Sequence, residues 1–284
     1  MKYCIKNGAC SLDKKPKKTI WIILLIIFII ILILGLLFVL KSYGIIFADK
    51  TPTRAETTEE PTTIATIATQ PPTERFDYPL APEPDMSSVD FDELENINED
   101  IYAWLYIPNT NVDLPVVQSI KDRDDFFYLS HNIYKEYQFS GAIYSEIQNS
   151  TDFSDPVTVL YGHNMINGSM FATLHKFEDE DFFNENTTMF VYTKHKLLTY
   201  LIYAAYETDD RHILNSFEPR TKEGFREFLD STLSPRSYNC NVRDVELNTN
   251  DRILTLSTCS NTVSGNRYLV QGVLVHERTR KQAK

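Results

Sequence analysis

Hydrophobic and polar positions divide this chain into three stretches of different character. Residues 20–40 read IWIILLIIFIIILILGLLFVL, an apolar run without a charged side chain. Residues 49–85 are rich in Thr, Pro, Glu and Ala, and neither the two-residue period of a strand nor the period of about 3.6 residues of a helix persists there. Beyond residue 88, short apolar runs bounded by Asn, Asp, Gly and Pro recur towards the C-terminus.

The apolar run Ile20–Leu40 predicts a single membrane-spanning helix. At about 1.5 Å per residue it reaches roughly 30 Å, the thickness of the hydrocarbon core of a bilayer. A signal peptide has a shorter apolar region of about 7–15 residues and a small-residue cleavage site, which is missing here. Four lysines lie just before the run, whereas Lys41 and Lys50 alone follow it closely. Basic residues mark the cytoplasmic side, so we expect residues 1–19 inside the cell and everything after residue 40 outside it.

The middle stretch predicts an extracellular linker over residues 41–87. Proline removes backbone donors and threonine is a poor helix former, so this segment favours an extended spacer that lifts the remainder off the membrane. Residues 88–284 are then one folded domain, long enough for a good hydrophobic core.

The pattern of that domain is mostly that of β-strands. β-Branched and aromatic residues dominate seven runs: VDLPVVQ, GAIYSE, VTVLYG, TMFVYT, KLLTYLIYAAYE, RILTLST and YLVQGVLVHE. Phe91, Leu94, Ile97 and Ile101 recur at helical spacing, with Ser87 or Ser88 as the expected N-cap. GSMFATLHKFEDEDFFNE and KEGFREFLDSTL also read as helical, and Phe225, Phe228 and Leu229 share one face of the second. We therefore expect a mainly β fold, a barrel with N-terminal and peripheral helices.

Composition and charge exclude some classes of function. The net charge of −11 argues against nucleic-acid binding, because an acidic chain gains nothing from counterion release. The four cysteines show no zinc-ligand spacing and the carboxylates form no compact cluster, so we expect no metal and no cofactor. The sequence leaves open whether Cys240 and Cys259 form a disulfide.

Cys259 ends the strand TLST, and Arg267 opens the next strand. If these strands are neighbours, an exposed thiol lies beside a permanent positive charge, which favours a thiolate and stabilises an oxyanion. Spacing alone favours the plainer interpretation, a half-buried cysteine and a surface arginine.

His163 directly follows the apolar strand VTVLYG and begins a polar loop. A histidine at a strand end is held on one side and free on the other, which suits acid–base catalysis. A solvated loop histidine is an equally good interpretation of this position. The other histidines, at 131, 175, 195, 212 and 276, do not follow a buried strand so directly.

These residues carry a resemblance to a known family. TLSTC at 255–259, followed by Arg267 at the head of RYLVQG, resembles the catalytic strand pair of sortases, and YGHNMINGSMF at 161–171 is similar to the histidine motif of their class B. The helix expected at 222–233 and the helical lead-in are also class B traits. The resemblance covers the whole folded domain.

The resemblance implies an eight-stranded β-barrel and a cysteine transpeptidase of the cell membrane. Sortases cleave the C-terminal sorting signal of surface proteins after a Thr, form a thioacyl-enzyme and pass the acyl group to an amine of a peptidoglycan precursor or a pilin. By matching, Cys259 is the nucleophile, His163 the acid/base and Arg267 the oxyanion stabiliser. Ser257 and Thr258, beside the nucleophile, are expected to touch the substrate.

The sequence also departs from the family's pattern. Many class B enzymes carry an acidic residue soon after the cysteine, whereas Ser260 and Asn261 follow here, and seven residues separate Cys259 from Arg267. This loop borders the substrate groove in the family, so the recognised sorting motif stays open. Two alternatives also remain: a membrane-tethered receptor or adhesin without enzymatic activity, and a hydrolytic cysteine protease.

Overall fold

The structure is a computed structural model that describes residues 75–85, 89–121 and 124–280. The expected cytoplasmic segment, the transmembrane helix at 20–40 and most of the expected linker lie outside these residues. Among the helices of the described ranges, none combines the length and the apolar character that crossing a bilayer demands.

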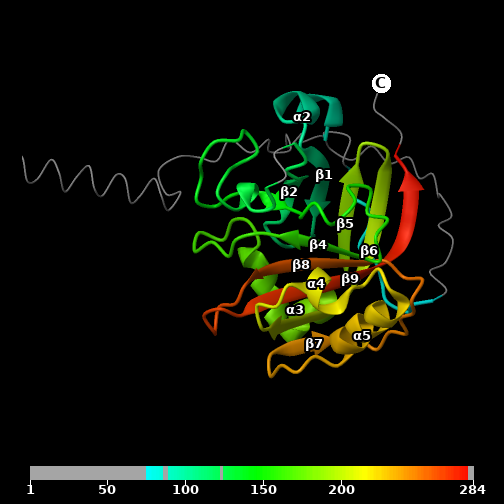
Figure 1. The fold of residues 1–284 in the computed structure, drawn as a ribbon. Helices are drawn as coiled ribbons and strands as arrows, with labels where there is room; N and C mark the ends of the chain where they lie inside the picture. Colours follow the sequence, from blue (N-terminus) through cyan, green and yellow to red (C-terminus); the bar gives the residue numbers. More distant parts are fainter. Residues whose placement is uncertain (1–74, 86–88, 122–123, 281–284) are drawn as a thin grey trace, which may run out of the picture. The chain divides into compact units, whose positions relative to one another are not determined.

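Eight strands close into a barrel (Figure 1). In order around the sheet they are β5 (Thr188–Thr193), β1 (Ile101–Tyr106), β2 (Asp113–Val117), β3 (Ile143–Tyr144), β4 (Val157–Tyr161), β8 (Ile253–Cys259), β9 (Arg267–Thr279) and β6 (Lys196–Thr208). The first half of β6 pairs with β5 and so closes the ring. A ninth strand, β7 (Cys240–Val242), pairs with the second half of β6. The expected eight-stranded, mainly β barrel is confirmed.

The two faces of the barrel strands bury different clusters. Leu254, Leu256 and Val270 belong to the cluster inside the barrel, together with Leu105 and Val191 from β1 and β5. Residues of the opposite face of β8 and β9, such as Ile253 and Leu269, pack against helices instead. Alternation with a period of two therefore gives these strands a buried side chain at nearly every position.

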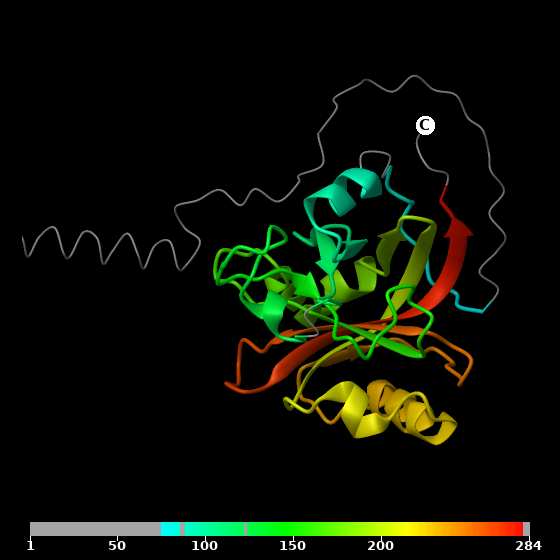
Figure 2. The same ribbon diagram turned by 45° about the horizontal axis from the view of Figure 1, so that its top comes forward.

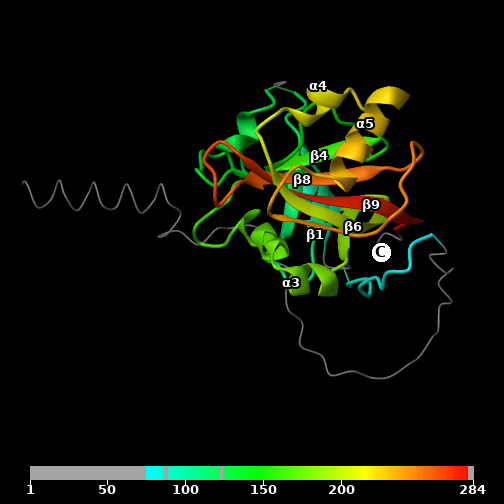
Figure 3. The same cartoon turned by 90° about the horizontal axis from the view of Figure 1, so that it is seen from below.

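Helices cover the outer face of β8, β9 and β6. Figures 2 and 3 show α4 (Ile213–Phe217) and α5 (Lys222–Leu233) lying together on this side. As predicted, Phe225, Phe228 and Leu229 form the buried face of α5. The remaining helices are α2 (Phe91–Ile97), α3 (Glu180–Glu185) and the 3₁₀ helices η1 (Phe127–Leu129) and η2 (Ala172–Glu178).

Several sequence expectations need correction. The N-cap of α2 is Asp90, not Ser87 or Ser88, because its carboxylate accepts the backbone N–H groups of residues 92 and 93. The helix ends at Ile97 and Ile101 begins β1, since the run IYAWLY favours a strand. The segment GSMFATLHKFEDEDFFNE is divided into η2 and α3, because Asp179 ends one helix and caps the next. Neither α4 nor β7 is predicted from the pattern.

The part of the linker that the structure describes packs on the barrel. In this N-terminal strap, residues 75–85, Phe76 is buried in the cluster beneath α5. Arg75 pairs with Asp251, and the N–H of Ala81 donates to Thr188 Oγ1 at 2.8 Å. The packed domain thus begins earlier than the boundary expected at residue 88.

Candidate active site

The three candidate residues lie at, or just beyond, one end of β4, β8 and β9. β4 and β8 are parallel, Tyr161 is level with Ser257, and the next N–H, that of Gly162, donates to the Ser257 carbonyl at 3.2 Å. β4 ends at Tyr161, and His163 follows two residues later in the loop after the strand. Cys259 in turn pairs with Arg267 on the antiparallel strand β9. Paired residues on neighbouring strands share a face, so Cys259 and Arg267 lie side by side. We refer to His163, Cys259 and Arg267 together as the candidate row.

The thiol and the guanidinium are in direct contact. Arg267 Nη1 lies 3.0 Å from Cys259 Sγ and donates a hydrogen bond to it. Cys259 is exposed, and neither it nor Cys240 forms a disulfide. The expected proximity of these two side chains is therefore observed, and the fixed charge is placed to stabilise a thiolate and an oxyanion.

His163 is held from the long segment between β2 and β3. Its Nε2 lies 2.8 Å from the carbonyl oxygen of Leu129, and its ring stacks on Phe139 with the centroids 5.5 Å apart. A carbonyl only accepts, so Nε2 carries the proton of this bond and Nδ1 is the nitrogen left for exchange. No hydrogen bond within the described residues joins His163 to Cys259.

Ser257 and Thr258 lie directly before the nucleophile and both are buried. The hydroxyl of Thr258 donates to the carbonyl of Gly162 at 2.8 Å, which ties the ends of β8 and β4 together. This hydrogen bond within the barrel explains the position of the Thr258 side chain. Ser257 shares the face of Cys259, and substrate contact by either residue stays a prediction.

Three side chains near the backbone carbonyl of Cys259 were not predicted from the sequence: Asn164, His175 and Glu178. The carbonyl of Cys259 accepts from Asn164 Nδ2 at 3.2 Å and lies 3.0 Å from His175 Nε2. His175 Nδ1 lies 2.5 Å from Glu178 Oε1 on the same 3₁₀ helix. The spacing of His175 and Glu178, three residues apart in a helical run after the histidine motif, was the available signal.

The loop between Cys259 and Arg267 is fastened to β6. Thr262 Oγ1 donates to Glu207 Oε2, and Asn266 Nδ2 donates to Glu207 Oε1 at 2.7 Å. The hydrogen bond from Thr262 is the largest cause that lowers the pKa of Glu207, and that from Asn266 adds to it. The carboxylate therefore stays charged and holds the loop against the end of β6.

Buried polar side chains line the other flank of the row. The rings of Tyr144 and Tyr161 stack with centroids 5.5 Å apart, and burial raises the pKa of both phenols. Beside them the carboxylate of Glu146 lies 2.7 Å from His212 Nε2 at the start of α4. Burial is the main cause that raises the pKa of Glu146, while His212 opposes the shift. This contact fastens α4 to the end of β3.

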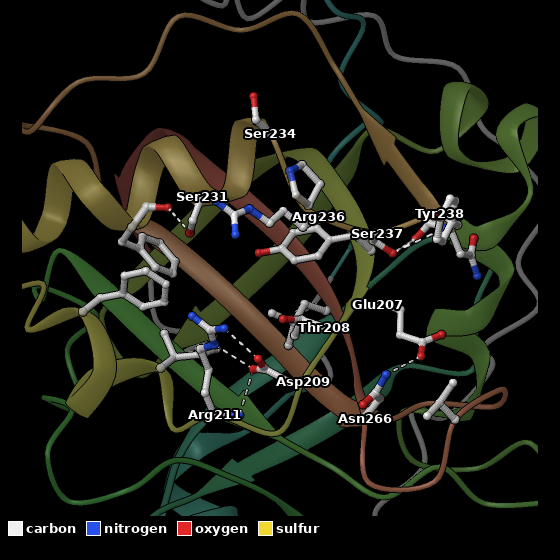
Figure 4. A pocket seen from close by; sticks show the side chains of 18 of the residues that line it. Glu207, Thr208, Asp209, Arg211, Ser231, Ser234, Arg236, Ser237, Tyr238 and Asn266 are labelled. Atoms are coloured by element: carbon white, nitrogen blue, oxygen red, sulfur yellow. Dashed lines mark hydrogen bonds and ion pairs between the residues drawn. The ribbon is translucent and has the colours of Figure 1, made fainter.

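A cavity of about 1020 Å³ opens on the far side of Arg267, between the end of β6, α4, α5 and the loop after Cys259 (Figure 4). Its walls are polar and carry both charges, with Asp209 and Arg211 joined across one side and Glu207 on the other. None of the three residues of the candidate row lines it. The cavity therefore lies beside the candidate row, and the three side chains of the row are outside it.

The described residues contain no group of three or more His, Cys, Asp or Glu side chains that could hold a metal ion. What the candidate row can do is nucleophilic and acid–base chemistry: it has a thiol beside a fixed cation, and an imidazole in the loop that follows the neighbouring strand β4.

Comparison with known proteins gives a consistent picture. A family model described as a sortase domain matches residues 105–275. The chain is 36% identical to sortase B of Listeria monocytogenes over 186 residues, which are 64% of this chain and 73% of that protein.

Solved structures extend this likeness to the fold. Clostridium perfringens sortase B matches with a TM-score of 0.58 and 35% identity, over 66% of this chain and 100% of that one. A Streptococcus pyogenes class B sortase involved in pilus biogenesis matches with a TM-score of 0.58 and 29% identity, over 66% of this chain and 99% of that one.

Proposed function

The chain belongs to the sortase family, in its class B, and from this premise we propose that Cys259, His163 and Arg267 perform its two-step transpeptidation. The observation that carries this assignment is the 3.0 Å contact between Arg267 Nη1 and Cys259 Sγ at the end of paired strands. A second support is the parallel pairing of β4 with β8, because His163 begins the loop that follows β4.

In the first step the Cys259 thiolate attacks the scissile carbonyl, and a carbon–sulfur bond forms. The carbonyl oxygen becomes an oxyanion, which the guanidinium of Arg267 stabilises. When the tetrahedral intermediate collapses, the carbon–nitrogen bond breaks and His163 gives a proton to the leaving amine. The product is a thioacyl-enzyme.

In the second step an amine attacks the thioester. His163 takes the proton of this amine, the carbon–sulfur bond breaks, and Cys259 leaves as a thiolate. Since one imidazole serves both the leaving and the incoming amine, both occupy the His163 side of the row. The acyl acceptor therefore reaches the thioester beside the segment that carries Leu129 and Phe139.

The substrates follow from the family and from its chemistry. Sortases act on surface proteins and pilins, and we assign to this chain a C-terminal sorting signal cut after a Thr. The acceptor is an amine of a peptidoglycan precursor or a pilin; the Streptococcus pyogenes relative involved in pilus biogenesis supports the second choice. Transfer of the acyl group to an amine distinguishes this function from that of a hydrolytic protease, which transfers it to water. Turnover of a peptide substrate distinguishes it from that of a receptor or adhesin, which has no enzymatic activity.

The proposed location is the cell membrane, with residues 20–40 as a single anchor and the barrel outside. The charge-free apolar run and the lysines before it support this orientation. Protease treatment of intact cells tests the proposal: the barrel should be digested while residues 1–19 stay protected. Protection of the barrel would contradict it.

The test of the reaction uses the full chain and a library of fluorogenic sorting peptides, with and without an amine acceptor. Cys259→Ala should abolish turnover, and mass spectrometry should find the acyl group on Cys259 of the wild type. Cys240→Ala is the matched control, because Cys240 is also a free, exposed thiol but lies on β7. Full turnover by Cys259→Ala would refute the mechanism.

A further inference from the structure

Exposed hydrophobic side chains concentrate on one segment of the molecule. In the part of the chain that the structure describes, nine large hydrophobic residues are exposed, and six of them lie between β2 and β3: Ile120, Phe126, Leu129, Tyr134, Tyr137 and Phe139. A seventh, Ile166, lies in the loop that begins with His163. Scattered apolar residues are normal on a protein surface, but a concentration of this kind marks an interaction site.

Buried polar side chains tie the segment between β2 and β3 to the start of β1. Asn98 Nδ2 donates to the carbonyl of Ile133 at 3.0 Å and to the hydroxyl of Tyr128 at 2.8 Å. The Tyr128 hydroxyl donates to Asp100 Oδ2 at 2.7 Å, and Lys135 Nζ lies 2.9 Å from the same oxygen. Asn98 and Asp100 are both buried. A partner that binds this segment therefore meets a preformed surface, and ordering it costs little entropy.

Within the segment, a short antiparallel ribbon carries a row of aromatic rings. His131 and Tyr137 pair across the ribbon, so their side chains share a face. Their rings meet edge to face with centroids 6.1 Å apart, and Phe127 stacks on His131 with centroids 4.1 Å apart. The Tyr137 side chain is the most exposed of the three.

These rings continue to His163. Phe139, two residues after Tyr137, stacks on the His163 ring with centroids 5.5 Å apart. The carbonyl of Leu129, two residues before His131, accepts from His163 Nε2 at 2.8 Å. We call Leu129, His131, Tyr137 and Phe139 the acceptor surface. The imidazole assigned to the leaving and incoming amines is in direct contact with it.

The size of the acceptor surface suits a short peptide. Tyr137, Phe139 and Leu129 are 72%, 46% and 40% exposed. At about 200 Å² for each large side chain, these fractions amount to roughly 300 Å². A folded protein partner would bury about 800 Å² on each side. The area therefore matches a flexible peptide better than a folded pilin.

Charge at the edge of the acceptor surface favours an amine. The carboxylate of Glu136, next to Tyr137, accepts from Asn132 Nδ2 at 3.4 Å and forms no ion pair within the described residues. Lys135 beside it is already paired with Asp100. An ammonium group is attracted by an unpaired carboxylate and by the faces of aromatic rings.

We propose that the acceptor surface binds the amine-bearing stem peptide of a peptidoglycan precursor and brings its amine to His163. The inference rests on the proposed function, because the role of His163 is what places the incoming amine on this side of the candidate row. It selects one of the two acceptors that this function leaves open, and it gives Tyr137 and Glu136 a part in acceptor binding.

The partition of the acyl-enzyme between an amine and water tests the proposal on the full chain, because this ratio does not depend on how much of the enzyme is folded. The probes are a synthetic stem peptide with a free lysine side-chain amine, and hydroxylamine, which is too small to need the surface. Tyr137→Ala should lower the ratio of transfer to hydrolysis about fivefold with the stem peptide and less than about twofold with hydroxylamine. Tyr238→Ala, which removes an exposed tyrosine of the cavity wall, should match the wild type with both probes.

Glu136→Gln tests the charge. Its ratio of transfer to hydrolysis with the stem peptide should fall about threefold at low ionic strength, and the difference from the wild type should shrink as salt is added. Glu223→Gln, at an exposed carboxylate in the first turn of α5, is the matched control.

Four kinetic outcomes would overturn the proposal. The first is an unchanged stem-peptide ratio in both Tyr137→Ala and Glu136→Gln. The second is an equal loss with hydroxylamine, because the side chains would then act through His163. The third is a raised KM for the sorting peptide with an unchanged ratio, which would assign the surface to the leaving segment. The fourth is impaired transfer to a folded pilin with intact transfer to the stem peptide.

Binding is measured independently of turnover by NMR of the ¹⁵N-labelled full chain in detergent. Titration with the stem peptide should shift the backbone amide signals of Tyr137 and Phe139 and leave that of Tyr238 in place. Shifts that miss the acceptor surface would refute the inference even if acyl transfer is confirmed. Wild-type chain that forms no acyl-enzyme would instead sink the proposed function, and the titration would still decide whether the surface binds the peptide.

Discussion

At the scale of single residues, the geometry of Arg267 decides what this site can do. Its Nη1 reaches Sγ while the residue remains partly exposed, so the planar guanidinium can serve both the sulfur and an oxyanion bound beside it. Lysine carries the same charge on a flexible stem and offers a point charge in place of a fork.

Arg267→Lys should therefore lower kcat about a hundredfold, a loss typical of removing one oxyanion donor. The measurement is turnover of the preferred sorting peptide. Arg278→Lys is the matched control, because Arg278 lies on the same strand and pairs with Glu83 at the surface. Comparable kcat values for Arg267→Lys and the control would exclude the assigned role of Arg267.

At the scale of elements, the junction of α4 and α5 depends on one glycine. Gly224 lies in the first turn of α5, and a Cβ there would come within 1.9 Å of the Phe217 carbonyl oxygen and 2.6 Å of that of Glu218. The close approach lets α4 end directly against α5, and so fixes the two helices that cover the outer face of the barrel.

Gly224→Ala should lower the stability of the domain by about 1–3 kcal/mol, although alanine is the better helix former by about 1 kcal/mol. The clash is expected to outweigh helix propensity because both close atoms belong to backbone carbonyls rather than to flexible side chains. Thermal unfolding measures the effect, expected as a decrease in Tm of roughly 2–10 °C. Arg226→Ala, on the exposed face of α5, is the control. An increase in Tm for Gly224→Ala would show that the junction relaxes.

At the scale of the whole molecule, the N-terminal strap belongs to the folded unit. Phe76 is 7% exposed and packs in the cluster beneath α5, far along the sequence from its neighbours Tyr203 and Val245. Arg75 is tied to Asp251, but its side chain is 42% exposed. Burial of the ring should therefore matter more than the ion pair.

Phe76→Ala should cost about 3 kcal/mol of unfolding free energy, and Arg75→Ala less than about 1 kcal/mol. Denaturant unfolding of the two variants beside the wild type gives both values. Equal, small losses would mean that the strap merely lies on the surface. A large loss for Phe76→Ala would show that a chain started at residue 88 lacks part of its core.

Much of the fold could be predicted because the pattern is local. Runs such as VTVLYG and RILTLST read as strands from alternation and β-branched content, and α5 was predicted at its observed bounds. Ile101 was assigned to the helical lead-in because it continues the spacing of Phe91, Leu94 and Ile97, but it begins β1. The short β7 exists only because β6 offers it a partner.

By itself, the sequence determined the seven predicted strands, the buried face of α5 and the order of the motifs that contain Cys259, His163 and Arg267. These are properties of neighbouring residues, and they suffice because side-chain periodicity and short motifs are read along the chain. Only the tertiary structure decided that Cys259 Sγ touches Arg267 and that His175 reaches the Cys259 carbonyl. Such contacts join residues on different elements, and their distances are set by sheet register and helix packing, which no local pattern encodes.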